Sequence, residues 1–385
     1  MDVKQIYEFV NTLTGEILGE TNIVNEDLSN IVDVGTKIFG ATAVDNYVRT
    51  LVDQIAKIVF VNRPYSGKAP SVLMDAWEYG AIVEKISAEI PSASENESWE
   101  LTDGESYSQD TFYKPVVSAK FFNNKMTFEV DMSFTELQVK SAFRSAYELN
   151  SFISMIVNAI EKSFTIKIDG LIMRTINSMI GETVHGDNTG LMAVNLLAMY
   201  NEHFNLSGAN VLLAADAITD AEFIRYASMI MALYIDRMSR ISVLYNIEHN
   251  ARFTSSDMLH IVMLSDFKAA ANSYLQSDTF HNEFTALPNA ETVPYWQGTG
   301  TDYSFDSISS INVKLASDNT VTVEQGGILA VMFDRDCLGV TNLERRVTTH
   351  YNAKAEFYNN FYKMDMGAFA DLGEQFVVFF IEDES

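Results

Sequence analysis

The sequence predicts an α+β protein whose segments follow one another along the chain, and three observations lead to this fold class. Apolar residues recur at helical spacing up to residue 59, and short β-prone runs follow between residues 74 and 131. Helical spacing then returns over residues 149–180, before helical and β-prone runs alternate toward the C-terminus. With 385 residues, 47% of them apolar, the chain is long enough for two or three cores.

Residues 1–70 form the first predicted segment, a helical arm. Apolar residues have helical spacing in 6–18 and again in 48–59. Asn, Pro, Ser and Gly residues within 62–67 then end the second helix. The arm therefore leads into a turn.

Residues 71–132 form the second segment, with β-prone runs at 79–86, 113–122 and 125–130. Residues 75–110 contain ten Asp or Glu and one Lys, which gives a local charge of −9. A two-stranded excursion of this kind has too little apolar surface for a core of its own. Two interpretations stay open: a solvated acidic loop, or a loop that docks on a partner subunit.

Residues 133–188 form the third segment, and a long helix dominates it. Ser133 and Glu136 have the spacing of a capping box, which satisfies free N–H groups at a helix start. The helical spacing of 149–180 then far exceeds the average helix of about 11–12 residues. Gly170 is expected to weaken this helix and mark a bend. Such a helix can act as a spine across a whole domain.

Residues 189–336 have the pattern of an α/β unit, and residues 337–385 follow as a C-terminal segment. The expected helices lie near 191–204, 221–238 and 268–276. The expected strands lie at 211–215, 259–264, 311–315, 328–333 and, in the last segment, 375–381.

Charge and residue usage argue against several classes of function. Asp and Glu outnumber Lys and Arg 52 to 26, and a formal charge of −26 argues against the basic surface that sequence-independent nucleic-acid binding requires. The single cysteine, Cys337, cannot form an internal disulfide and favours a reducing compartment. The sequence has no secretory pattern at its start and no apolar run near the ~18 residues that span a bilayer. We expect synthesis in the cytoplasm and no membrane association.

The motifs of common catalytic and cofactor sites are missing from the sequence. It has no phosphate-binding G-x-x-x-x-G-K-[ST] loop, no H-E-x-x-H pair, no C-x-x-C and no G-x-S-x-G. The six histidines lie far apart, which favours structural or surface roles over metal binding. We expect no catalytic residue, no cofactor and no metal. Folding can still bring two of the 52 carboxylates together, so an acidic hydrolase is kept as an alternative.

Arg345 and Arg346, with Lys354 and Lys363 beyond them, form a basic cluster in an otherwise acidic sequence. One interpretation is local charge balance on the surface. The other is an inter-subunit contact with acidic residues of the 71–132 excursion in a neighbouring copy. The candidate acidic partners are Glu95, Glu97, Glu100 and Asp103. Opposite patches on one chain favour head-to-tail association, which closes into rings.

Two stretches of the sequence resemble the capsid proteins of small phi29-like podoviruses. One is VGTKIFGATAVDNYVRTLVDQIAKIVFV at 34–61, which resembles their arm. The other is FTELQVKSAFRSAYELNSFISMIVNAIEKSF at 134–164, which resembles the entry to their spine helix and contains a Phe-x-Ser-x-Ile-x-Asn-Ala-Ile pattern at 152–160. The order of segments also resembles that of tailed-phage major capsid proteins with the Hong Kong 97 fold.

The resemblance assigns a part of that fold to each segment. It implies an N-terminal arm at 1–70, an extended β-hairpin loop (E-loop) at 71–132, a peripheral domain with the spine helix at 133–188, an axial domain at 189–336, and a return to the peripheral domain at 337–385.

The resemblance also implies a structural, non-enzymatic function. Copies would assemble as hexamers and pentamers into an icosahedral shell that encloses double-stranded DNA without sequence-specific binding. The implied partners are further copies of the chain, a separate scaffolding protein and a portal protein at one vertex. The implied location is the virion, after assembly in the host cytoplasm. An encapsulin-like nanocompartment shell has the same fold and is the main alternative.

Overall fold

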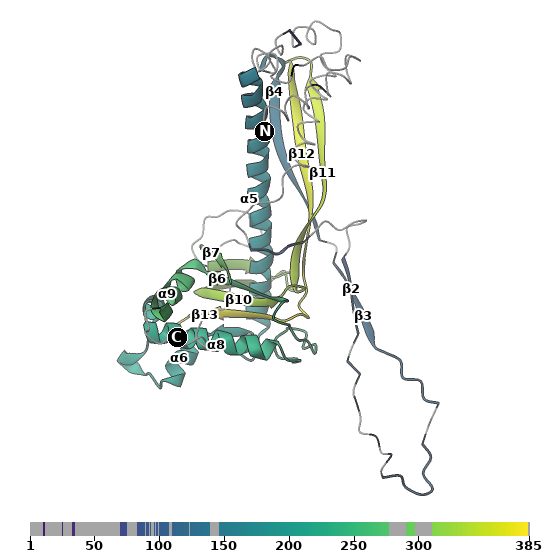
Figure 1. The fold of residues 1–385 in the computed structure, drawn as a ribbon, viewed down its shortest axis with the longest axis vertical. Coiled ribbons are helices and arrows are strands. Elements are labelled where there is room, and N and C mark those ends of the chain that lie inside the picture. Colours follow the sequence, from purple (N-terminus) through teal and green to yellow (C-terminus); the bar gives the residue numbers. More distant parts are fainter. Residues whose placement is uncertain are drawn as a thin grey trace.

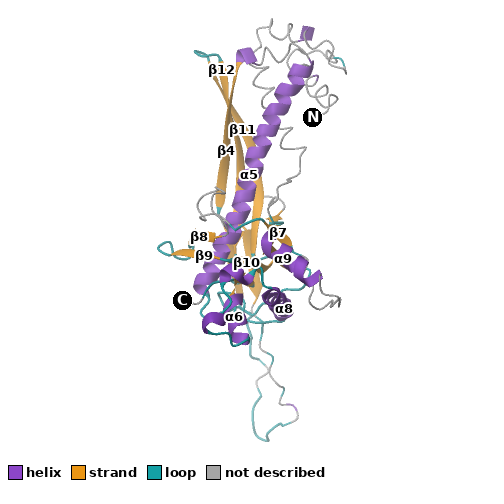
Figure 2. Ribbon diagram, turned by 90° about the vertical axis from the view of Figure 1, so that its left-hand side faces the viewer, coloured by secondary structure: helices purple, strands orange, loops and turns teal. Residues whose placement is uncertain are grey.

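The computed structural model shows two compact parts and one extended part (Figure 1). A long helix beside a tall sheet forms the upper part, a smaller sheet with helices forms the lower part, and a two-stranded ribbon leaves their junction (Figures 1 and 2). The structure describes residues 70–74, 83–88, 146–276, 290–296 and 310–383, most of 90–138, and positions 11, 25, 33 and 34. The predicted arm at 1–70 therefore lies almost entirely outside the described residues.

Helix α5 (Ala146–Gly186) confirms the predicted spine. Its 41 residues extend about 60 Å at a rise of ~1.5 Å per residue. Ile156, Ile160 and Phe164 are buried, because steps of four residues keep them on one side of the helix. The helix runs through Gly170 without interruption, although we expected a weak point there. No helix in the described part of the chain is long and apolar enough to cross a membrane.

The tall sheet packs along α5 and has the strand order β1-β11-β12-β4. Its strands are β1 (Leu73–Met74), β4 (Lys125–Thr135), β11 (Leu338–Asn352) and β12 (Phe357–Ala370). Alternate residues of β12 are buried, from Tyr358 through Tyr362 to Met366. The sequence analysis missed β11 and β12, because polar residues interrupt their apolar positions and no continuous apolar run marks them.

The tall sheet corrects two predicted boundaries. β1 and β4 contain residues that we assigned to the extended loop at 71–132. The helix start predicted at Ser133 is wrong, because Ser133 pairs with Asn359 inside the sheet. The capping box lies two residues later. Gln138 N–H donates to Thr135 Oγ1 over 3.2 Å, and Thr135 N–H donates to Gln138 Oε1 over 2.9 Å.

The lower sheet has the strand order β5-β13-β10-β6-β7, and its buried residues belong to the same apolar core as those of α5 and β12. Its strands are β5 (Ala193–Asn195), β6 (Leu259–Leu264), β7 (Glu291–Val293), β10 (Ile328–Asp334) and β13 (Phe376–Phe380). Its helices are α6 (Leu196–His203), α8 (Ala221–Met238) and α9 (Ser265–Gln276) (Figure 1). All residues of β10 and β13 are buried. The helix predicted at 221–238 and the strand predicted at 259–264 are confirmed.

In the lower part, one predicted helix is present with a wrong start, and one predicted strand is wrong. The helix expected at 191–204 begins only after β5, where the Asn195 side chain accepts hydrogen bonds from two backbone N–H groups and caps α6. The strand expected at 211–215 is not formed in this described stretch. The chain there has a short 3-10 helix, η2 (Gly208–Asn210), and a helical turn, α7 (Ala214–Ala217).

The C-terminal segment is divided between the two parts, whereas we expected 337–385 to return to the peripheral domain. β11 and β12 lie in the tall sheet, but β13 pairs with β10 in the lower sheet. The hairpin of β8 (Ser310–Lys314) and β9 (Thr322–Gly326) packs on α5.

Candidate assembly surface

The ribbon that leaves the junction ends in a long open loop (Figure 1). It consists of β2 (Val83–Ala88) and β3 (Val117–Phe122), which are antiparallel with Lys85 opposite Lys120. Residues directly opposite each other share a face, and the faces alternate along each strand. The ribbon therefore has an inner face that carries the two lysines, and an outer face formed by the positions between them.

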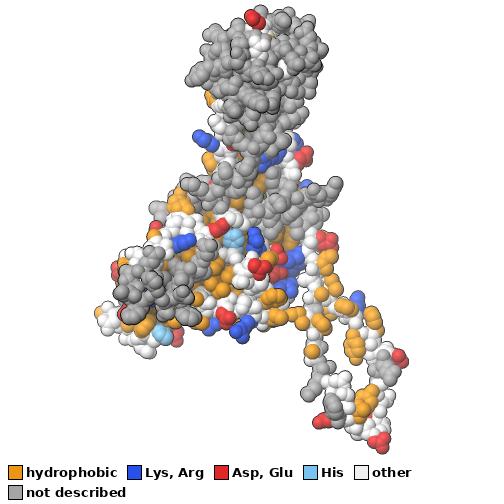
Figure 3. Space-filling view, viewed as in Figure 1, with side chains coloured by type: hydrophobic (Ala, Val, Ile, Leu, Met, Phe, Trp, Pro, Cys, Tyr) orange, Lys and Arg blue, Asp and Glu red, His pale blue; other side chains and the backbone are white. Residues whose placement is uncertain are grey.

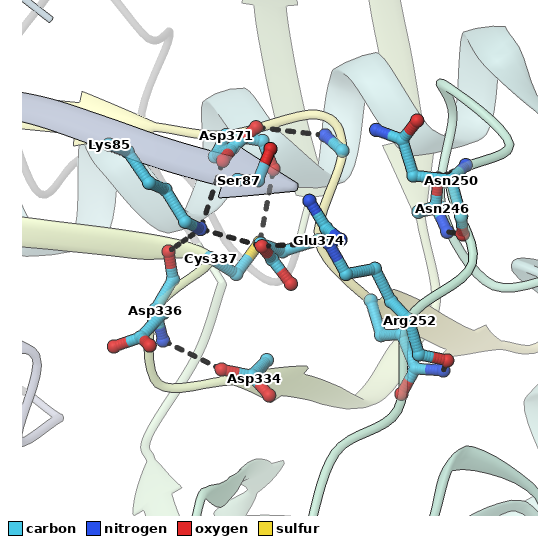
Figure 4. A network of polar contacts seen from close by, with 12 residues as sticks. Lys85, Ser87, Asn246, Asn250, Arg252, Asp334, Asp336, Cys337, Asp371 and Glu374 are labelled. Carbon is cyan, nitrogen blue, oxygen red and sulfur yellow. Dashed lines mark hydrogen bonds and ion pairs between the residues drawn. The ribbon is translucent and has the colours of Figure 1, made fainter. Parts of the chain in front are cut away.

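Ion pairs attach the inner face to the body (Figure 4). Lys85 Nζ lies 3.0 Å from Asp371 Oδ2 and 2.7 Å from Glu374 Oε1. Lys120 Nζ lies 2.7 Å from Asp371 Oδ1 and 2.5 Å from Glu248 Oε2. The two carboxylate oxygens of Asp371 thus bind one lysine from each strand. We call these five residues the root network.

The root network offsets a repulsion that the ribbon itself creates, because like charges directly opposite each other destabilise a strand pair. Asp371 lies between the two lysines with its side chain only 3% exposed. Burial alone would raise the pKa of Asp371. The hydrogen bonds from Lys120 and Gly373 N–H and the ion pair with Lys85 outweigh burial, so the pKa lies below its usual value. Burial would likewise lower the pKa of both lysines, but their bonds to the carboxylates raise it.

The turn between β12 and β13 supplies two of the acidic groups and is itself held in place. Arg252 Nε lies 3.1 Å from Glu374 Oε1, so a third cation shares this acidic site. A Cβ at Gly373 would lie 2.8 Å from Lys120 Nζ and 2.6 Å from Glu248 Oε2, so the ends of these two flexible side chains would have to shift to admit a larger residue.

The outer face of the ribbon and the loop beyond it expose apolar side chains (Figure 3). Ile86 is 65% exposed and Phe121 is 64% exposed, and in the loop Phe112 and Tyr113 are each 84% exposed. The other exposed large apolar residues here are Ile90, Leu101, Tyr107, Val116 and Val117. Monomeric soluble proteins rarely expose apolar residues in such continuity, so this surface indicates an interaction site.

The four predicted acidic contact residues lie in the loop. Glu100 and Asp103 are exposed. Glu95 and Glu97 lie outside the described residues. We call residues 100–113 the tip of the ribbon. The tip points away from the tall sheet, so the structure does not bring Glu100 and Asp103 to the predicted arginines within one chain (Figure 1).

The two predicted arginines lie on β11 and have charged neighbours in their own chain. Arg346 forms an ion pair with Asp365, and its Nη1 lies 3.8 Å from Glu344 Oε2. Burial lowers the pKa of Arg345, and the negative charge of Glu161 acts in the opposite direction. Arg346 therefore has the local charge balance that was one of the two interpretations. A contact of these arginines with a neighbouring copy stays a prediction.

The sequence analysis missed the root network. One signal was present, because Lys85 is the single lysine within the acidic stretch at 75–110. Nothing local indicated its partners, since Lys120 and Asp371 are separated by 251 positions. Among the described residues, no group of three or more His, Cys, Asp or Glu is placed to hold a metal ion.

Comparisons with known proteins bear on both fold and family. The model of the Phi29-like phage major capsid protein family matches residues 10–380. The capsid structure of Staphylococcus phage Andhra has a TM-score of 0.52 and 10% identity, over 84% of this chain and 88% of that chain. The capsid structure of Cyanophage P-SCSP1u has a TM-score of 0.48 and 10% identity, over 84% of this chain and 92% of that chain. No curated protein sequence matches the chain.

The similarity to the Andhra capsid shows the fold, at an identity too low to show more. The Hong Kong 97 type of fold, expected from the resemblance, is confirmed, and the mixture of helices and sheets agrees with the α+β class. The family match extends over nearly the whole chain and supports neither the nanocompartment nor the hydrolase alternative. The chain therefore belongs to the Phi29-like phage major capsid protein family and is a structural subunit of a phage capsid shell.

Proposed function

We propose that copies of this chain assemble as hexamers and pentamers into an icosahedral shell that encloses double-stranded DNA. The observation that carries the proposal is the ribbon, whose inner face is ion-paired to its own subunit while its outer face and tip are uncovered. Such apolar area contributes free energy only when another molecule covers it. In a shell, the next copy of the chain is always present to do so.

The asymmetry of the ribbon supports rings. The surface that it offers differs from the surface that receives it, so the contact between copies is head-to-tail. Contacts of this kind close into rings when the rotation between copies permits. Stable assemblies of this type bury upward of ~2,000 Å² per interface, of which the ribbon supplies one part.

The charge of the chain supports enclosure of DNA without specific binding. With a formal charge of −26, the protein repels the phosphate backbone on average. A wall of such subunits lets densely packed DNA move along it without adhering. A basic lining would instead hold the DNA in place.

Further partners follow from the family resemblance. We propose that a separate scaffolding protein directs assembly in the host cytoplasm and that a portal protein occupies one vertex of the shell. Expression of the chain alone and together with its neighbouring genes tests this. Closed particles of uniform size should require the neighbouring genes.

Negative-stain electron microscopy of the purified protein tests the shell. We expect closed polyhedral particles, or rings of five and six subunits. Nuclease-protected double-stranded DNA inside particles from infected cells would identify the contents, whereas an enclosed enzyme would favour a nanocompartment. A persistent monomer under both expression conditions would contradict the proposed assembly.

A further inference from the structure

Residues 70–74, which follow the predicted arm, contact the tall sheet through a very short strand. Val72 is buried, and its carbonyl accepts from Val340 N–H over 3.1 Å. Leu73 and Met74 then pair with β11 as the two-residue strand β1. Strands usually have three to ten residues, and a shorter one makes few ladder bonds. The tall sheet alone therefore holds this part of the chain weakly.

Ser71 contacts the lower sheet instead. Its backbone N–H donates to Glu291 Oε2 over 2.7 Å, and its hydroxyl donates to Glu291 Oε1. Two donors of one residue thus meet the two oxygens of one carboxylate. Glu291 belongs to β7, an edge strand and the uppermost strand of the lower sheet in Figure 1. Hydrogen bonds to a charged group are roughly twice as strong as bonds between neutral groups, so Glu291 supplies a firm hold just before β1.

His260 orients this carboxylate from within the lower sheet. Its Nε2 lies 2.9 Å from Glu291 Oε2. An ionised carboxylate has no proton to give, so the histidine is the donor. The imidazole stacks on the ring of Phe333 in β10, with centroids 5.0 Å apart and planes at 5°, and its side chain is only 11% exposed. The position of the donor is therefore set by the packing of β6 against β10.

The backbone that carries Glu291 is also tied to α9. One residue before Glu291, the carbonyl of Ala290 accepts from Lys268 Nζ over 2.5 Å. Two residues after it, the carbonyl of Val293 accepts from Ser265 Oγ over 3.0 Å. β7 is therefore held on both sides of Glu291 without any contribution from Ser71, and the acceptor is in place before the chain at Ser71 reaches it.

The contact is strong enough to hold the chain and exposed enough to open. Burial alone would raise the pKa of Glu291. The hydrogen bonds from Ser71 and the bond and charge of His260 outweigh burial, so the pKa lies below its usual value and the group is ionised at neutral pH. The side chain of Glu291 is nevertheless 40% exposed, so water can replace Ser71 without leaving a buried charge.

We propose that Ser71, Glu291 and His260 form a clasp that fastens the chain to the lower sheet just before β1 and that opens without unfolding either sheet. Glu291 is the acceptor and His260 is a positioning residue. Opening releases the chain before Val72, where the predicted arm joins the body. The lower sheet thereby sets the point at which the arm leaves the body. The inference concerns a single subunit and does not depend on the proposed shell.

Hydrogen exchange on unassembled subunits tests the clasp directly, because the amide of Ser71 is one of its donors. Glu291→Gln removes the charge of the acceptor and keeps its shape. Glu324→Gln, at an exposed position on β9, makes the same change in net charge and is the control. We expect the Ser71 amide, resolved from overlapping peptides, to exchange about tenfold faster in Glu291→Gln. Exchange in β10 and the urea midpoint should stay unchanged.

Three results would overturn the inference. One is an unchanged exchange rate of the Ser71 amide in Glu291→Gln. Another is an equal acceleration in the Glu324→Gln control, which would assign the effect to net charge. The third is a lower urea midpoint of Glu291→Gln with faster exchange in β10, because Glu291 would then support the whole lower sheet and would not act as a local clasp.

Tryptic cleavage after Lys68, three residues before Ser71, gives an independent readout, with cleavage after Lys354 in the turn between β11 and β12 as the internal reference. Ser71→Ala removes one donor without touching the lower sheet, so it stays informative if Glu291→Gln fails to fold. It should speed cleavage after Lys68 several-fold, and an unchanged rate would overturn the clasp.

Two variants of His260 separate its hydrogen bond from its packing. His260→Phe keeps a ring on Phe333 but removes the donor, whereas His260→Gln keeps a donor and removes the ring. If His260 positions the carboxylate, His260→Phe should speed cleavage after Lys68 several-fold, and His260→Gln should have the smaller effect. The opposite order would show that only ring packing matters and would overturn the positioning role.

Discussion

The central strand of the lower sheet and the ribbon both carry aromatic side chains on β-structure, but in opposite environments. Every residue of β10 is buried, and Phe333 has no exposed surface. On the ribbon, Phe121 is 64% exposed. The difference separates two sources of stability. The lower sheet stabilises the single subunit, whereas the apolar area of the ribbon contributes when copies come together.

Replacing each of these phenylalanines by alanine should give the largest difference in subunit stability between the two regions. Phe333→Ala removes a ring that stacks between His260 and Phe376, with centroids 5.0 Å and 5.5 Å away. It should lower the free energy of unfolding of the subunit by about 3–5 kcal/mol. Phe121→Ala should change it by less than about 0.5 kcal/mol. Urea unfolding of unassembled subunits measures both, and similar losses would mean that the ribbon is part of the subunit core.

The same contrast explains which elements the sequence could predict. β6 and β10 bury most of their residues within one chain, and α8 buries one side of its helix, so each has a strong local apolar pattern from which its position follows. β11 and β12 satisfy their polar positions through pairing, as Asn360 does while fully buried in β12. An alternating pattern with such residues is a weak local signal, although Tyr358, Tyr362 and Met364 do follow it.

Some features of the assembly surface could also be predicted from the sequence, and others could not. The acidic excess of the excursion and its thin apolar content were visible in the sequence, but they left two interpretations open, a solvated loop and a loop that docks on a partner subunit. The root network was not visible, because the ion pairs of Lys85 and Lys120 with Asp371 depend on a fold that joins distant positions.

The second prediction compares Gly327, at the junction of β9 and β10, with Gly190, between α5 and β5. Gly327 has φ +64°, and a Cβ there would overlap the carbonyl oxygen of Ile381. Gly327→Ala should therefore cost about 2–4 kcal/mol of subunit stability, from backbone strain and overlap together. Gly190 has φ +70° with open space around it, so Gly190→Ala should cost only about 1 kcal/mol. Equal shifts in the urea midpoint would show that the backbone at Ile381 moves aside at little cost in free energy.

The third prediction tests the boundary between body and ribbon. Asp371→Asn removes the charge that separates Lys85 from Lys120 and should lower subunit stability by about 1–3 kcal/mol. It should also speed proteolytic cleavage within 89–116, because the root is held less firmly. Asp336→Asn is a matched control, since Asp336 accepts from Lys85 through its backbone carbonyl. If Asp336→Asn lowered subunit stability and sped cleavage as much as Asp371→Asn, the effect would come from net charge and not from the root network.

The fourth prediction is the pH dependence of the root network. The pKa of Asp371 is lower in the folded protein than its ordinary value near 3.8. Its stabilising contribution is therefore complete above about pH 4 to 5 and is lost as the pH falls through the folded pKa. Many other carboxylates titrate in this range, so the informative quantity is the difference in unfolding free energy between the unaltered chain and Asp371→Asn. That difference should shrink between pH 5 and pH 3, and a constant difference would contradict the assignment.

The smallest expected effect is at Arg346, and it tests the predicted contact of this arginine with a neighbouring copy. Arg346 is 41% exposed and paired with Asp365, so Arg346→Ala should change subunit stability by only about 0–1 kcal/mol, with the loss reduced further by salt. Alanine is preferable to glutamate here, because a glutamate beside Asp365 would add repulsion within the subunit and confuse folding with assembly. If Arg346 serves only local charge balance, Arg346→Ala should form particles at the same subunit concentration as the unaltered chain. A large rise in that concentration at unchanged stability would place a contact between copies at Arg346 on β11, since nothing else about the subunit would have changed.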